Sequence, residues 1–160
     1  MNFRPAEEKD TGLILFFIRE LAQYENLSDE VIATEDTLRE WIFDKKKAEV
    51  LFVLHEEKEV GFALFFHNFS TFAGRAGIYL EDLYVMPEHR GKGYGKGLLV
   101  ELARIAVERG CGRLEWVCLN WNKPSIDFYL SLGAVQMKDW MIYRLTGDTL
   151  LNVAKIKTDK

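Results

Sequence analysis

The chain alternates between segments with helical and segments with extended hydrophobic spacing. Apolar side chains that recur every three or four residues predict helices, which span 11–23, 34–42, 98–107 and 124–132, with a further helix starting at Asp148. Asp10 and Thr34 precede the first two helices and belong to the residue types that cap helix N-termini. Pro124 suits a first helical turn, and Gly133 follows the end of that helix.

Short apolar segments between polar turns predict the strands. They span 2–4, 50–55, 60–69, 78–86, 113–119 and 137–145, and residues 56–59 form the turn of a hairpin. Helices and strands interleave along the chain, and no repeat, linker or low-complexity segment interrupts them. This order predicts one α/β domain over residues 1–160, with a mixed central sheet flanked by helices.

The composition narrows the class of protein. The chain has 160 residues, of which 48% are hydrophobic, enough for a core of its own. Its formal net charge of −4, from 21 basic and 25 acidic residues, disfavours a nucleic-acid partner. The apolar run from Leu13 to Ile18 is too short for a signal sequence or a membrane span. Cys111, Cys118 and three separated histidines show no metal-ligand spacing, so we expect a cytoplasmic protein without a metal.

A basic, glycine-rich segment from Glu88 to Gly97 lies between a predicted strand and the helix expected from Leu98. Backbone N–H groups at a helix start are unpaired and lie at the positive end of the helix dipole, and glycines let an anion approach them. The segment therefore predicts a phosphate site. A P-loop is excluded because the spacing from Gly91 to Lys96 is one residue short, and the spacing of a dinucleotide fingerprint is not met either.

Arg90, Gly93 and Gly95 form the pattern Arg-x-x-Gly-x-Gly, which resembles the acetyl-CoA pyrophosphate motif of the GNAT superfamily of N-acetyltransferases. Residues 20–25, 78–91 and 121–134 are similar to one branch of it, the diamine acetyltransferases, which include spermidine/spermine and thialysine acetyltransferases. The resemblance covers nearly the whole chain. It implies the GNAT fold, a cytosolic homodimer, acetyl-CoA as co-substrate and an acidic pocket for a small-molecule amine.

The resemblance also implies roles for individual residues and implies no metal ligand. Acetyl-CoA would be bound by three groups of residues: Leu83, Tyr84 and Val85 on a strand; Arg90, Gly91, Lys92, Gly93, Tyr94, Gly95 and Lys96 in the loop; and Asn122, Pro124, Ser125 and Tyr129 on the far side. The amine would be bound by Tyr24, Glu25, Glu81, Glu115, Trp116 and Val117.

The chemistry of amine acetylation points independently to two of these residues. An alkylammonium with a pKa of about 10.4 must lose a proton before its nitrogen can attack. Glu81 is the candidate base, directly or through water, and Asp82 is expected on the opposite face of the strand because side chains alternate. A backbone N–H within 83–85 would stabilise the tetrahedral intermediate. The phenol of Tyr129 would protonate the leaving thiolate of CoA.

Two departures from the spermine-type enzymes bear on the substrate. Those enzymes carry an acidic residue and a tryptophan where residues 70–75 here read Ser-Thr-Phe-Ala-Gly-Arg, which is closer to the thialysine type. Lys138 stands where they place a carboxylate. Both changes remove acid from the pocket, so we expect thialysine, lysine or a short diamine to be preferred over a long polyamine. A non-catalytic CoA-binding module and a protein N-acetyltransferase remain open as alternatives.

Overall fold

The computed structural model describes residues 1–158, and the chain divides into two compact units. The first, Met1–Val117, contains a five-stranded sheet with helices on both of its faces. The second begins at Cys118 and contains two helices, α4 (Lys123–Ser131) and α5 (Gly147–Ala154). Among the described residues, no helix is both long and apolar enough to cross a membrane.

The strands lie in the sheet in the order in which they occur in the chain. They are β1 (Asn2–Pro5), β2 (Glu49–His55), β3 (Lys58–Ser70), β4 (Arg75–Val85) and β5 (Leu114–Trp116). The first four pair antiparallel, and β5 pairs parallel with β4 after a helical crossover. The predicted mixed sheet is therefore confirmed, although β5 is shorter than the expected strand over 113–119.

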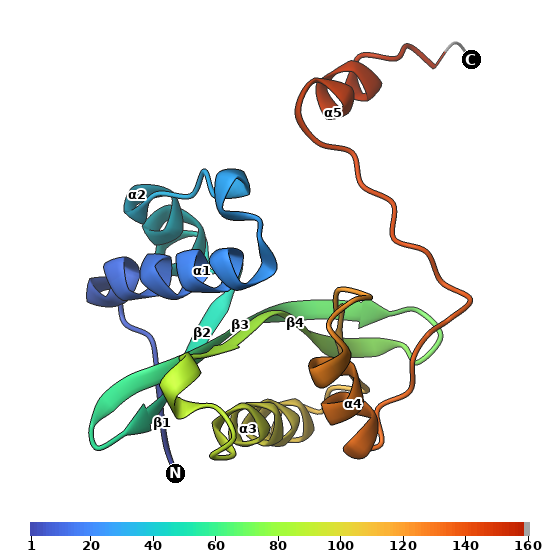
Figure 1. Cartoon of the computed structure of the whole chain (residues 1–160). Coiled ribbons are helices and arrows are strands. Elements are labelled where there is room, and N and C mark those ends of the chain that lie inside the picture. Colours follow the sequence, from blue (N-terminus) through green and yellow to red (C-terminus); the bar gives the residue numbers. More distant parts are fainter. Residues whose placement is uncertain (159–160) are drawn as a thin grey trace. The chain divides into compact units, whose positions relative to one another are not determined.

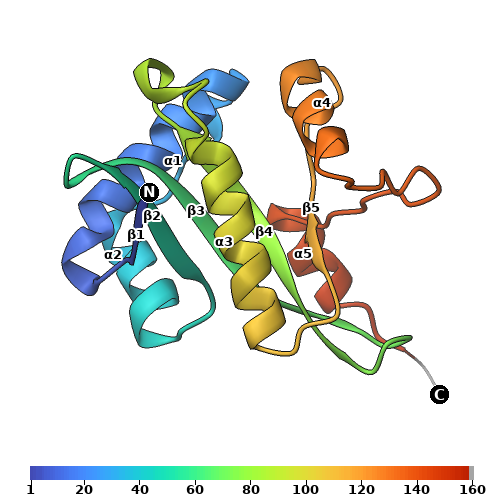
Figure 2. The ribbon, with the colours of Figure 1, turned by 90° about the horizontal axis from the view of Figure 1, so that it is seen from below.

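Helices cover both faces of this sheet (Figure 1, Figure 2). One face carries α1 (Thr11–Glu25) and α2 (Glu35–Leu38), which continues as the π-helical turn η3 (Arg39–Asp44), and the other carries α3 (Tyr94–Glu108). Phe17 of α1 stacks on Phe62 of β3 with ring centres 5.3 Å apart, and Phe52 and Tyr84 join the same cluster. Burial of these aromatic rings holds α1 against the sheet.

The two predicted helix caps have different outcomes. Thr34 caps α2, because its hydroxyl accepts a hydrogen bond from the Thr37 N–H at 3.2 Å. Asp10 does not cap α1, so that prediction is wrong. Its carboxylate instead accepts hydrogen bonds from Arg4 at 2.6 and 3.0 Å and from the Glu7 N–H at 2.8 Å. The carboxylate of Asp10 is thus bound by Arg4 of β1, whereas the local sequence pattern predicts that it caps α1.

Helix α3 begins at Tyr94, four residues before the predicted start at Leu98. The apolar pattern begins only at Leu98, but a first helical turn does not require a buried face. The Gly97 N–H donates to the Gly93 carbonyl at 2.8 Å and closes that turn. A Cβ at Gly97 would collide with Met1 and stand 3.2 Å from Phe3, so this glycine permits close packing.

The strand predicted over 137–145 is not formed, and that prediction is wrong. Lys138 and Asp139 form a turn, and the other residues of the segment belong to neither a helix nor a strand. Alternating apolar residues indicate an extended backbone, but a strand also needs a neighbouring strand to pair its N–H and C=O groups. Within the described residues, no strand pairs with this segment.

Strand β4 contains a β-bulge at Glu81. Leu80 pairs with Phe65 and Asp82 pairs with Leu64, which leaves Glu81 as the extra residue. The extra residue changes the alternation of side chains, so that Leu80 and Asp82 lie on opposite faces although they are two residues apart. Asp82 shares the face of Leu64, which packs against the core beneath α1.

Candidate active site

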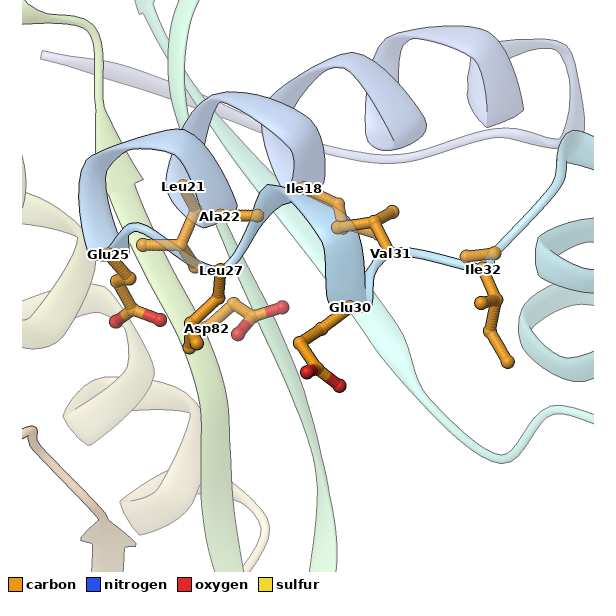
Figure 3. Close-up of a pocket in the computed structure, with 10 residues that line it drawn as sticks. Ile18, Leu21, Ala22, Glu25, Leu27, Glu30, Val31, Ile32 and Asp82 are labelled. Atoms are coloured by element: carbon orange, nitrogen blue, oxygen red, sulfur yellow. The ribbon is translucent and has the colours of Figure 1, made fainter. Parts of the chain in front are cut away.

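A cavity of about 310 Å³ lies beneath the C-terminal end of α1. It is bounded by that helix, by the segment that follows it with the short turn η2 (Ser28–Glu30), and by β4 (Figure 3). Its lining residues are Ile18, Leu21, Ala22, Glu25, Leu27, Glu30, Val31, Ile32, Ala33 and Asp82. The lining thus combines an apolar wall with three carboxylates and contains no basic side chain.

The three carboxylates reach the cavity from three elements. Glu25 ends α1, Glu30 lies in η2, and Asp82 follows the bulge of β4; Figure 3 shows all three below the end of α1. Within residues 1–158, none of them forms an ion pair with a basic side chain. Carboxylates beside an apolar wall favour a cationic ligand that brings its own charge and an alkyl chain.

Desolvation and mutual repulsion act on these carboxylates. Burial, together with the negative charges of Glu81 and Glu25, raises the pKa of Asp82 from 3.8 to about 7. Burial also raises the pKa of Glu25. A bound ammonium would lower both pKa values, because an opposite charge nearby favours the ionised carboxylate.

Asp82→Asn is expected to change the pH dependence of stability. Because the pKa of Asp82 is higher in the folded than in the unfolded chain, the folded state loses stability as pH rises from about 4 to about 7. Asparagine removes that loss, so we expect a melting temperature roughly 5 °C above the parent at about pH 8 and little difference at about pH 4. Thermal unfolding of both proteins at each pH measures this.

The exposed Asp29→Asn change is the matched control, because it makes the same replacement outside the cavity lining. If the gap between Asp82→Asn and the parent protein were the same at both pH values, Asp82 would not be held protonated in the fold.

The predicted amine-binding residues are only partly brought to this cavity. Glu25 lines it, and Tyr24 precedes Glu25 at the end of α1. Glu81 is exposed at the bulge, next to the lining residue Asp82. Asp82 and Glu30 are missing from the predicted site. Asp82 lies on the same face as Tyr84, two residues away on β4, but the sequence does not show that the end of α1 covers this part of the sheet.

The glycine-rich segment forms the connection between β4 and α3. Gly91, with φ 73°, and Gly93, with φ 86°, adopt the left-handed conformation that side chains disfavour. No atom lies within 4 Å of where a Cβ would stand at either residue. Gly93 is the N-cap of α3, so the N–H groups of Tyr94, Gly95 and Lys96 belong to its open first turn. This geometry fits an anionic group such as the CoA pyrophosphate.

The end of β4 supports the first turn of α3. A Cβ at Gly95 would stand 3.7 Å from Leu83 Cδ2 and 3.9 Å from Val85 Cγ2, so these two side chains lie directly against the helix start. Tyr84 belongs instead to the core cluster on the α1 face. The three predicted strand residues therefore divide between the two faces of the sheet.

Two loop side chains contact neighbouring elements. The Tyr94 hydroxyl is hydrogen-bonded to His55 Nδ1 of β2 at 2.7 Å, and Lys92 lines a second cavity of about 340 Å³ beside these two residues. Arg90 turns back toward the sheet, where its Nε donates to the Val85 carbonyl at 2.8 Å. Tyr94 and Arg90 thus fix the loop to β2 and β4.

The predicted residues around β5 lie outside the cavity lining. The Glu115 carboxylate accepts a hydrogen bond from Asn68 Nδ2 at 2.7 Å and pairs with Arg113 at 2.9 Å. Its charge is therefore already balanced by protein groups. Trp116 is the last residue of β5, and Val117 follows it with an exposed side chain.

The second unit contains the remaining predicted residues. The buried Asn122 caps α4 with its side-chain oxygen, which accepts from the Ser125 N–H at 3.4 Å, and Pro124 lies in the first turn as predicted. Tyr129 is half-buried on the same helix, with its ring centre 5.3 Å from that of Phe128. The cap and the proline fix the start of the helix that carries the candidate proton donor.

Comparison with known proteins gives a family. The model of the "Acetyltransferase (GNAT) family" matches residues 15–134. The thialysine N-epsilon-acetyltransferase of Bos taurus is 39% identical over 163 residues, which cover 94% of this chain and 95% of that protein. The L-ornithine N5-acetyltransferase of Arabidopsis thaliana is 42% identical over 103 residues, which cover 64% of this chain and 45% of that protein.

A solved structure has the same fold over almost the whole length. It is an integron cassette protein from the mobile metagenome of V. cholerae, with a TM-score of 0.81, 29% sequence identity, and coverage of 97% of this chain and 98% of that one. The family model spans most of the chain, and the bovine relative extends over nearly all of it. The chain therefore belongs to the acetyltransferase (GNAT) family, in the branch of its thialysine relatives, and is an acetyl-CoA-dependent N-acetyltransferase of small-molecule amines.

Proposed function

We propose that this enzyme acetylates a primary amine of thialysine, lysine or a short diamine. The observation that carries the proposal is the cavity beneath α1, where an apolar wall meets three carboxylates without a basic side chain. Such a lining suits an ammonium on a short alkyl chain. The similarity to thialysine and ornithine acetyltransferases supports the same class of acceptor.

In the proposed mechanism, the amine attacks acetyl-CoA directly. Glu81, next to the lining residue Asp82, takes the proton from the ammonium, directly or through water. The nitrogen forms a bond to the thioester carbon, and a backbone N–H within 83–85 stabilises the oxyanion. The carbon–sulfur bond then breaks, and Tyr129 donates its proton to the thiolate of CoA. The nitrogen releases its second proton to water as the amide forms, and the tyrosinate regains a proton from water. The loop from Gly91 to Lys96 holds the pyrophosphate of CoA, and the family resemblance assigns other contacts with CoA to Asn122, Pro124 and Ser125 at the start of α4.

The number of carboxylates in the cavity favours a short amine as the acceptor of the acetyl group. Each ammonium removed from water needs a compensating negative charge. Burial and mutual repulsion raise the pKa of Asp82 to about 7, so the cavity's three carboxylates are not all ionised at neutral pH without a ligand. A long polyamine carries more ammonium groups than this lining can compensate, and the replacement of acid by Ser70 and Lys138 adds none.

We expect kcat/KM for thialysine or a short diamine to exceed that for spermine. The test is release of the free thiol of CoA, measured with thialysine, lysine, putrescine, spermidine and spermine at one ionic strength. Reactions without an amine give the background hydrolysis. If spermine were the best substrate by tenfold or more, the reading of specificity from the cavity charges would be wrong, and if no amine released thiol, the proposed activity would fail.

We also propose that the enzyme is a homodimer. In the second unit, many large apolar side chains are exposed, among them Val135, Trp140, Ile142 and Tyr143. Exposed large apolar side chains are frequent at protein interfaces. A second copy of the chain is the partner that the family resemblance implies. Sedimentation of the purified enzyme tests this, and a species with the mass of one chain at all concentrations would contradict it.

A cytoplasmic location is the remaining part of the proposal. Cys111 is a free thiol. Free thiols are usual in compartments where glutathione and thioredoxin keep cysteines reduced.

A further inference from the structure

Arg90 belongs to the loop motif that resembles a pyrophosphate site, but its side chain is held by protein groups. Its Nε donates to the Val85 carbonyl at 2.8 Å. Its guanidinium carbon stands 4.7 Å from the ring centre of Tyr24 and 5.1 Å from that of Tyr84. A guanidinium at this distance over an aromatic ring is attracted by the negative face of the ring's quadrupole.

The two aromatic rings connect Arg90 to the amine cavity. Tyr24 is the residue before Glu25, which lines the cavity. Tyr84 is buried, and its hydroxyl donates to Glu20 of α1 at 3.4 Å. Arg90 therefore contacts α1 directly at the ring of Tyr24. It also contacts α1 indirectly, through Tyr84 and its hydrogen bond to Glu20.

The Nε donor of Arg90 is thus taken by the protein, and two aromatic rings lie against its guanidinium. The loop does not need this charge, since Gly91, Gly93 and the first turn of α3 present backbone N–H groups, and Lys92 and Lys96 are also basic.

We propose that Arg90 is a positioning residue, which fixes the end of α1 and its cavity relative to the acetyl-CoA loop through Tyr24 and Tyr84. The inference rests on the proposed acetyl-CoA and amine sites. It assigns Arg90 to the amine side of the reaction, although its place in the motif assigns it to the phosphate side. Disturbing the contact shifts Glu25 and the cavity, while the backbone of the loop keeps its hold on CoA.

The test compares variants of Arg90 and Tyr24 in the full-length enzyme. Arg90→Lys keeps the charge but loses the planar guanidinium and its Nε donor, whereas Tyr24→Leu removes the aromatic face and Tyr24→Phe keeps it. We expect Arg90→Lys and Tyr24→Leu each to raise the KM of the amine roughly 3- to 30-fold, the range of one cation–π contact. The KM of acetyl-CoA should change less than about threefold in each, and Tyr24→Phe, which keeps the aromatic face, should raise the amine KM less than Tyr24→Leu does.

A double variant shows whether the two residues act through one another. If Arg90 and Tyr24 work as a pair, Arg90→Lys/Tyr24→Leu raises the amine KM no further than the more severe single change. Multiplicative effects of the two changes would overturn the proposal. So would a rise in the KM of acetyl-CoA with an unchanged amine KM, which is the result expected if Arg90 binds phosphate.

Two further measurements separate this inference from the proposed function. Denaturant unfolding of the parent, Arg90→Lys, Tyr24→Leu and the double variant shows whether the Arg90–Tyr24 contact exists. If it does, the effects of the two changes on the free energy of unfolding are non-additive. If the effects of Arg90→Lys and Tyr24→Leu on unfolding are additive and the parent enzyme is active, the positioning role of Arg90 is wrong and the proposed function stands. A parent enzyme that releases no thiol with any amine overturns the proposed function and this role with it.

Discussion

Tyr129→Phe is expected to lower kcat by about 10²–10⁴-fold, the usual contribution of a general acid. The proposed mechanism leaves a thiolate on CoA as the carbon–sulfur bond breaks, and the phenol of Tyr129 supplies the proton. Phenylalanine keeps the ring, which packs beside Phe128 on α4, and removes only the hydroxyl. The KM values for both substrates should therefore change much less than kcat. Steady-state thiol release at saturating acetyl-CoA and amine measures the effect.

Tyr143→Phe is the matched control, because it makes the same change at an exposed tyrosine in the same unit. A Tyr129→Phe enzyme with parental kcat would remove the phenol from the mechanism.

Glu81→Gln should lower kcat by about 10²–10⁴-fold as well, because it removes the proposed base. In the parent enzyme, the rate should rise between about pH 6 and pH 9 as the amine loses its proton. A flat profile would contradict rate-limiting deprotonation.

Gly93→Val is expected to weaken acetyl-CoA binding by about 10–100-fold, in line with the cost of forcing a side chain into a left-handed conformation. Gly93 has φ 86° and caps α3, and no atom lies within 4 Å of the place where its Cβ would stand. A Cβ at this position would therefore meet no clash with residues other than its chain neighbours. Valine would instead disfavour the backbone conformation that presents the first-turn N–H groups, and its methyl groups would occupy the space that the anion needs. Calorimetric titration with CoA measures the loss.

The opposite end of the same helix offers a control. Gly110 follows α3 with φ 68° and is equally free of nearby atoms, so Gly110→Val introduces the same kind of backbone strain away from the loop. Both variants should lose similar stability, but only Gly93→Val should lose affinity for CoA. Unchanged affinity in a folded Gly93→Val protein would place the pyrophosphate elsewhere.

The sequence by itself determined the features that depend on neighbouring residues. The hairpin of β2 and β3 and the strand before the glycine-rich loop follow from local apolar runs, and the Thr34 cap and the proline of α4 follow from residue type. The left-handed glycines of the loop are local too, because only glycine adopts such angles readily. The position of the glycine-rich loop between a strand and a helix could therefore be predicted without a structure.

The tertiary structure decided which side chains meet. The bulge at Glu81 arises from pairing between β3 and β4 and places Leu80 and Asp82 on opposite faces. The packing of α1 covers Asp82, and burial raises its pKa. The contacts of Arg90 with Tyr24 join residues that are far apart in the chain, and Asp10 turns from its helix to Arg4 in the same way. The segment 137–145 has the alternation of a strand but no strand beside it. Each of these features depends on a partner from another part of the chain, and a local pattern of polar and apolar residues carries no information about that partner.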